Sequence, residues 1–255
     1  MPHGLRRSVF ALLCALLTVP AAAQEAADGM GALDGAALSP ATLKYETTVE
    51  MGQRSMTRPT VRTLTEGTHD GTPIWRVVDA VQGAPQADTL FLDRASLRPL
   101  QRRVGGRMAL TLTFDSTSVV GTLRAGGQSR AMERTFDQPV LSSTANVEVG
   151  MATLPLDSGY VAQMPVYHLQ QKEVTPITLR VVGTDSVTVP AGVFETFVVE
   201  ATSQGPGPSG TYYVRQNAPH HVVKADLEVA ASQGRTATAT KQLTSLQEAS
   251  AAAGK

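Results

Sequence analysis

Apolar and polar residues alternate along many short segments of this chain, as they do in β-strands that have one buried and one solvated face. The alternation is clearest in three segments, 43–51, 108–115 and 223–229. Other segments are rich in β-branched and aromatic residues and are bounded by turn residues, which also predicts strands. These weaker candidates are Thr60–Thr65, Ile74–Val81, Thr89–Leu92, Leu100–Val104, Ser118–Leu123, Arg130–Phe136, Tyr160–Leu169, Thr178–Val182, Phe194–Thr202, Tyr212–Arg215 and Thr236–Leu243.

The connections between these segments predict a meander. Several are short glycine turns, such as Gly105-Gly106 and Ala125-Gly126-Gly127, which join neighbouring antiparallel strands. Helical signals are scarce. The best candidate extends from about Ser142 to Thr153, with Ser142 or Ser143 as N-cap and Pro155 ending it.

One short helix covers little of the apolar surface that about a dozen one-sided strands present. Three architectures bury such strands: a β-sandwich, a closed barrel, or a strongly curved sheet around its own side chains. We expect a mostly β fold with a single large curved antiparallel sheet, a half-barrel, and one short helix. The alternative is a β-sandwich.

The ends of the chain indicate export. Residues 1–23 combine a charged start (Arg6-Arg7), an apolar run that is too short to span a bilayer, and small residues at 21–23, which predicts a cleaved signal peptide. We expect a flexible leader at 24–40, a β domain at 41–248 and a flexible tail at 249–255. The mature protein would be periplasmic or secreted and would have no transmembrane segment.

Composition excludes several classes of function. Cys14, the only cysteine, lies in the signal peptide, so the mature chain has no disulfide and no thiolate metal site. The chain has 22 basic and 22 acidic residues, and removal of Arg6 and Arg7 leaves 20 against 22, a net charge of −2. A nucleic-acid-binding protein would be expected to carry a basic face. We therefore expect no nucleic-acid partner, no cofactor and no metal.

The sequence offers no catalytic constellation. It has no G-x-S-x-G motif, and Gly207-Pro208-Ser209-Gly210 is not followed by a helix signal. Neighbouring residues on a strand point to opposite faces, so His220 and His221 cannot readily share a metal ion, and metal binding would need His168 or His69 to converge with one of them. Four aspartates, each expected at a turn or on a wet face, are interpreted as turn-capping residues. They are Asp70, Asp79, Asp88 and Asp93.

Three motifs resemble a family of exported bacterial proteins catalogued as domain of unknown function 3108. They are Leu154-Pro-Leu-Asp-Ser-Gly-Tyr with Met164-Pro-Val-Tyr, then Val187-Thr-Val-Pro-Ala-Gly-Val-Phe-Glu-Thr-Phe-Val-Val, and Tyr212-Tyr-Val leading to Val222-Val-Lys. The likeness covers residues 154–229 most clearly and extends weakly to residue 43. It implies a curved sheet similar to that of the periplasmic lipoprotein carriers (LolA/LolB-like). It implies no known activity and no catalytic residue.

The large apolar residues are candidates for a filled core or for the lining of a ligand cavity. The leading hypothesis is non-enzymatic binding of an apolar small molecule or lipid on the concave face of the sheet. The alternative is a structural or partner-binding envelope protein, which would dock an envelope protein by strand addition at an exposed edge. A hydrolase is the third possibility. The candidate ligand-binding residues are Tyr45, Trp75, Leu110, Leu112, Phe114, Phe197 and Tyr213.

Overall fold

The computed structural model describes residues 26–169, 171–205, 207–230 and 236–249. The predicted signal peptide, with Cys14, lies outside the described residues, as does the predicted tail beyond residue 249.

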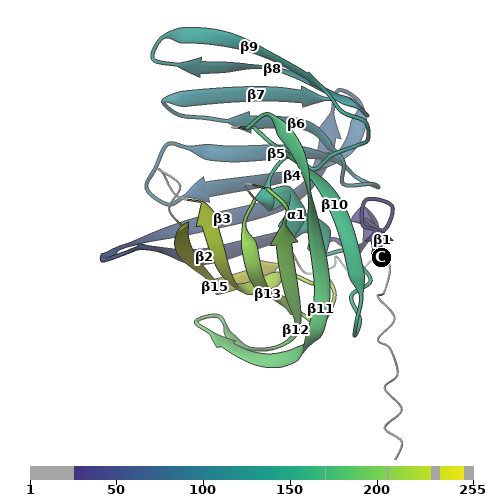
Figure 1. Cartoon of the computed structure of the whole chain (residues 1–255), viewed down its shortest axis with the longest axis vertical. Helices are drawn as coiled ribbons and strands as arrows, with labels where there is room; N and C mark the ends of the chain where they lie inside the picture. Colours follow the sequence, from purple (N-terminus) through teal and green to yellow (C-terminus); the bar gives the residue numbers. More distant parts are fainter. Residues whose placement is uncertain (1–25, 170, 206, 231–235, 250–255) are drawn as a thin grey trace, which may run out of the picture.

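Within these residues the strands form one 15-stranded sheet, and a single α-helix accompanies it (Figure 1). The first half contains β1 (Ala27–Asp28), the 3-10 turn η1 (Gly35–Ala37), β2 (Ala41–Met51), β3 (Arg54–His69), β4 (Thr72–Val81), β5 (Ala87–Asp93), β6 (Pro99–Val104), β7 (Met108–Phe114), β8 (Ser118–Ala125) and β9 (Gln128–Thr135). The second half contains α1 (Thr144–Met151), β10 (Val161–His168), β11 (Glu173–Val189), β12 (Gly192–Ser203), β13 (Ser209–Arg215), β14 (Val222–Ala230) and β15 (Thr236–Glu248).

The sheet is a meander in which β2 lies near the middle of the strand order and β1 lies at one edge. Strands β2 to β9 follow one another outward to one edge, and β10 to β15 return from the other side until β15 pairs with β2. The segment that contains α1 joins the two outer parts of the sheet. Strong curling brings the β10–β11 hairpin in front of strands β4 to β6 (Figure 1). The prediction of one large curved antiparallel sheet is confirmed, and the sheet is an open half-barrel rather than a sandwich or a closed barrel.

The short glycine turns and the helix follow the sequence predictions. Gly106, Gly126 and Gly127 have positive φ, the conformation that glycine adopts most easily. Ser143 is the N-cap of α1, and its side chain accepts a hydrogen bond from the backbone N–H of Asn146.

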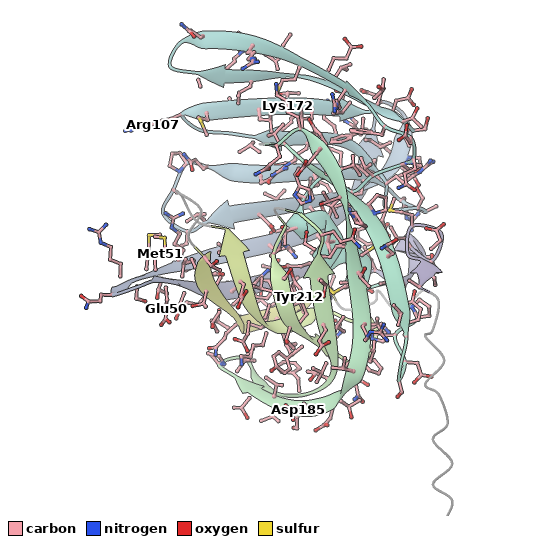
Figure 2. All side chains as sticks on the ribbon, in the orientation of Figure 1. Glu50, Met51, Arg107, Lys172, Asp185 and Tyr212 are labelled. Carbon is pink, nitrogen blue, oxygen red and sulfur yellow. The ribbon has the colours of Figure 1, made fainter. Side chains whose placement is uncertain are left out.

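The main core fills the concave side of the sheet around α1. Trp75, Tyr212 and Leu43 are among its largest fully buried side chains (Figure 2 labels Tyr212). All residues of α1 from Asn146 to Met151 are buried, because the sheet curls around the helix. A second, smaller core lies under strands β7 and β8 and includes Leu110, Leu112, Phe114 and Tyr167.

The leader 24–40 differs from the prediction, since its described part, 26–40, packs against the domain. Strand β1 pairs in parallel with β10, and Leu33 and Leu38 are buried in the main core. The Trp75 indole N–H donates to the carbonyl oxygen of Gly35 at 2.9 Å. The segment is held by backbone hydrogen bonds and by two leucines, a combination that leaves no periodic pattern in the sequence.

Candidate functional site

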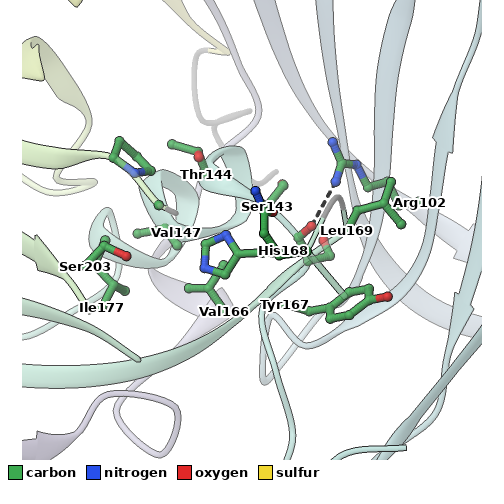
Figure 3. A pocket seen from close by; sticks show the side chains of 14 residues that line it. Arg102, Ser143, Thr144, Val147, Val166, Tyr167, His168, Leu169, Ile177 and Ser203 are labelled. Atoms are coloured by element: carbon green, nitrogen blue, oxygen red, sulfur yellow. Dashed lines mark hydrogen bonds between the residues drawn. The ribbon is translucent and has the colours of Figure 1, made fainter. Parts of the chain in front are cut away.

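A cavity of about 350 Å³ opens between the start of α1 and the β10–β11 hairpin (Figure 3). Its walls come from five parts of the chain: β6, the helix start, the β10–β11 hairpin, the end of β12 and the connection between β12 and β13. Arg102 on β6 and His168 on β10 belong to opposite ends of the strand order. They line one cavity because the sheet curls around the helix.

The inner wall of this cavity is apolar. Val147 of α1, Val166 of β10 and Ile177 of β11 line it, and each is buried in the main core. Leu169 and Tyr167 continue the wall toward the second core. Such a surface binds apolar groups by removing their area from water.

Polar groups surround the apolar wall. Ser143 and Thr144 come from the helix start, and Ser203 comes from the end of β12. The His168 ring Nε2 lies 2.7 Å from the Thr175 hydroxyl oxygen. Burial lowers the pKa of His168, so this imidazole is neutral near pH 7 and offers one donor and one acceptor.

Arg102 fixes the geometry of the helix start. Its Nε and Nη2 atoms donate to the Asp88 carboxylate at 2.6–3.1 Å, and its Nη1 donates to the Ser142 carbonyl oxygen at 2.9 Å (Figure 3). The guanidinium charge is therefore compensated by Asp88. In this structure Arg102 is a positioning group that ties residue 142 to the sheet.

A buried ion cluster, formed by Arg62, Asp79, Glu148 and Lys241, lies on the concave face. Glu148 accepts from Arg62 Nη1 at 2.7 Å and from Lys241 Nζ at 2.6 Å. Arg62 also donates two bonds of 2.7 Å to Asp79. Burial alone would raise the pKa of Glu148, but the charges of Lys241 and Arg62 outweigh burial and hold it below its usual value.

This ion cluster is electrically balanced and attaches α1 to three strands of the sheet, β3, β4 and β15. Two interpretations of the aspartates are thereby corrected. Asp79 and Asp88 were expected at turns or wet faces, but they lie inside strands β4 and β5 and pair with arginines on the concave face. Asp70 and Asp93 do lie at turns, where Asp93 accepts the backbone N–H groups of residues 95 and 96.

The residues predicted to bind a ligand lie mostly in the core. The Tyr45 hydroxyl donates to the Val222 carbonyl at 2.9 Å, and its ring lies under the Lys241 ammonium. Trp75 is 1% exposed, and Leu110, Leu112 and Phe114 fill the second core. None of these five lines the 350 Å³ cavity.

The last two predicted ligand-binding residues lie elsewhere in the sheet. Phe197 packs edge-on against His220, with ring centroids 5.9 Å apart. Tyr213 alternates with the buried Tyr212 and lies beneath Lys224. Neither lines the 350 Å³ cavity, while Phe114 contributes to a smaller one of about 150 Å³ beside Val140.

The histidines do not form a catalytic arrangement in the described part of the chain. His221 is 4% exposed, and its Nε2 lies 3.8 Å from a Glu248 carboxylate oxygen, inside the protein rather than in a cleft. His220 contacts the Arg215 carbonyl oxygen through Nδ1. Among the described residues, none of those that line the 350 Å³ cavity beside His168 is acidic. The described residues contain no cluster of three potential metal ligands.

The fold and the cavity define a class of protein, an open β half-barrel with one buried helix and a pocket on its concave side. The model of the family "Protein of unknown function (DUF3108)" matches residues 41–240. The chain belongs to this family, which confirms the resemblance that its sequence motifs indicate. A comparison with curated proteins found no match. No helix in the described residues combines the length and hydropathy needed to cross a membrane.

Three solved structures are similar to this chain. One is described as an exported protein with a YmcC-like fold from Bacteroides fragilis (13% identity, 83% of this chain and 97% of that chain, TM-score 0.32). Another is a DUF1329 family protein from Desulfovibrio piger (9% identity, 85% and 88%, TM-score 0.31). The third is described as a lipoprotein from Parabacteroides distasonis (10% identity, 82% and 96%, TM-score 0.29).

Proposed function

We propose that this protein is an exported cell-envelope protein that binds an apolar or lipid-like small molecule and catalyses no reaction on it. The observation that carries the proposal is the 350 Å³ cavity between α1 and the β10–β11 hairpin. Its volume falls near the lower end of the range for small-molecule sites, roughly 300–1,000 Å³. A single acyl chain or a similarly slim apolar group fits such a space better than a bulky lipid.

Binding would be driven by burial of the ligand's apolar surface. Each 100 Å² removed from water contributes about 2.5 kcal/mol before the entropic costs of association are subtracted. Val147, Val166 and Ile177 supply the apolar contact, and their positions are fixed by the main core. The hydroxyls of Ser143, Thr144 and Ser203 would solvate the polar end of a bound molecule.

The first test of the proposal is native mass spectrometry, with organic extraction, of protein purified from the envelope fraction. The proposal predicts a co-purifying apolar molecule. A fluorescent acyl probe should bind to folded protein from which this molecule has been removed. Protein that is ligand-free in repeated preparations and also ignores acyl probes would reject the proposal.

A matched pair of variants locates the binding site. Thr144→Trp places a large ring at the cavity and leaves the Ser143 cap intact, so it should weaken probe binding about tenfold or more. Thr65→Trp places the same ring at an exposed position of β3 away from the cavity and should bind like the unmodified protein. Equal binding by both variants would place the probe elsewhere.

A second candidate function is partner binding by strand addition. Strand β9 pairs only with β8 in the described residues, and nearly all of its residues are exposed. Such an edge offers unpaired backbone groups to an extended segment of another protein. Photo-crosslinking from Ser129 in intact envelopes tests it, with Thr65 as the control position. A single defined adduct from Ser129 alone supports strand addition, and identical patterns from both positions contradict it.

A further inference from the structure

Another cavity, of about 230 Å³, lies at the exposed edge of the sheet, and three cations line it. Arg130, Met132 and Arg134 alternate along β9, and Lys172 reaches it from the connection between β10 and β11. Register pairs Arg130 with Leu123 and Arg134 with Val119, so both arginines share the concave face with the apolar side chains of β8. Figure 2 labels Lys172 at the tip of the β10–β11 hairpin.

The charges at this cavity are available to a ligand. Arg130, Arg134 and Lys172 are exposed, and among the described residues none of them forms an ion pair. Glu133 also contributes to the cavity, but it alternates with Met132 and Arg134 along β9, so its side chain points to the opposite face of the strand. Lys172 has φ 58°, where glycine would cost less, so turn geometry alone does not favour a lysine there.

Tyr167 connects this cavity to the larger one, because it lines both. Its ring packs on Phe136 with centroids 5.1 Å apart, within the second core. Burial raises the pKa of Tyr167 even though Arg134 acts to lower it, so the hydroxyl keeps its proton and can donate a hydrogen bond. An apolar pocket, a tyrosine and a group of cations therefore follow one another across the concave face.

We infer that the bound molecule is an anionic amphiphile, with its apolar chain in the 350 Å³ cavity and its phosphate or carboxylate group at Arg130, Arg134 and Lys172. The inference rests on the proposed function and adds the charge of the ligand to it. Among the described residues these three cations have no carboxylate partner, so they attract an anionic head, repel a cationic one and give a neutral one no such attraction. Salt screens this attraction and weakens it. Tyr167 separates the apolar and the anionic ends of the site.

The experiment uses displacement of a fluorescent acyl probe by three competitors below their micelle-forming concentrations. Dodecyl phosphate and dodecyl maltoside carry the same chain with an anionic and a neutral head, and inorganic phosphate is the anion without a chain. Dodecyl phosphate should displace the probe at about tenfold lower concentration than dodecyl maltoside at low salt, and the difference should shrink near 0.5 M salt. Inorganic phosphate should not displace it.

Two triple variants remove the same amount of charge. Arg130→Gln/Arg134→Gln/Lys172→Gln should abolish the preference for dodecyl phosphate, whereas Arg54→Gln/Arg58→Gln/Arg76→Gln, at exposed positions of β3 and β4, should retain it. Circular dichroism and the melting temperature verify that both variants fold.

Each remaining outcome has a defined meaning. Equal displacement by both detergents overturns the anionic assignment and leaves the proposed function intact. Loss of the preference in both triple variants, or displacement of the probe by inorganic phosphate as well as by the detergents, also overturns the assignment. Failure of every chain-bearing compound to displace the probe, or of the probe to bind, overturns the proposed function and this inference together.

Discussion

Removal of the Glu148 carboxylate should destabilise the protein far more than removal of an exposed carboxylate. The Glu148 side chain is 4% exposed and accepts charge-assisted bonds from Arg62 and Lys241. Arg62 retains Asp79, but Lys241 forms no other ion pair to a carboxylate among the described residues and is only 13% exposed. Glu148→Ala therefore leaves a buried ammonium without its counter-charge.

The size of the effect follows from these contacts. Two hydrogen bonds to charged groups contribute about 1.5–3 kcal/mol each, and breaking a buried pair from one side costs about 3–5 kcal/mol. For a chain of this size, that loss lowers the melting temperature by about 6–20 °C. The matched control is Glu66→Ala, since Glu66 pairs with Arg94 at the surface with side chains 45% and 53% exposed. The control should cost less than about 1 kcal/mol.

Urea unfolding followed by circular dichroism measures both free energies of unfolding. A double-mutant cycle with Lys241→Met isolates the Glu148–Lys241 coupling, which should be about 1–3 kcal/mol. The reasoning is refuted if Glu148→Ala and Glu66→Ala have equal effects, or if the cycle gives no coupling.

The remaining predictions concern pH and the packed leader. Burial, reinforced by the charge of Arg215 and opposed by Glu248, lowers the pKa of His221 from 6.5 to about 4. As the pH falls, the unfolded chain therefore takes up this proton before the folded protein does, and the protein should lose about 3 kcal/mol of stability between pH 6.5 and pH 4. His221→Leu should flatten the dependence of the free energy of unfolding on pH, as measured by urea unfolding. Equal pH dependence in the variant and the unmodified protein would contradict this prediction. The native pKa of Glu148 is below its usual value, so its contribution to the free energy of unfolding is complete above pH of about 4.5 and is lost as the pH falls through the native pKa. Glu148→Gln should therefore lose less stability at acidic pH than the unmodified protein. An added Cβ at Gly35 would overlap the Arg94 carbonyl oxygen, so Gly35→Ala should release the leader and shift the emission of Trp75, the only tryptophan, to longer wavelength. Gly67→Ala, where the nearest atom is 3.9 Å away, should leave the emission unchanged, and a similar shift in both variants would refute the packing.

The strands were predictable because their signal is local. Alternation over segments such as 108–115 indicates which face of a strand is buried, and the Ser142-Ser143 pair indicates the helix start without knowledge of distant residues. The number of one-sided strands favoured a curved sheet but left a β-sandwich as the alternative. Strand lengths were less well predicted, since β3 continues to His69, beyond the predicted end at Thr65.

The site and the ion cluster were not predictable in the same way. The walls of the large cavity come from residues as far apart as Arg102 and Pro208, which only the curl of the sheet brings together. Asp79 and Glu148 have the sequence context of solvated residues, and their partners are distant along the chain. Large aromatic residues such as Trp75 are candidates for ligand binding in the sequence, because size alone does not distinguish a core position from a cavity wall.

The most direct measurement of the central claim is anomalous diffraction from crystals grown with 12-bromododecanoic acid. The account predicts a bromine peak against Val147, Val166 and Ile177, with the carboxylate directed toward Tyr167. An empty cavity in crystals that hold bromine at other surfaces would contradict it.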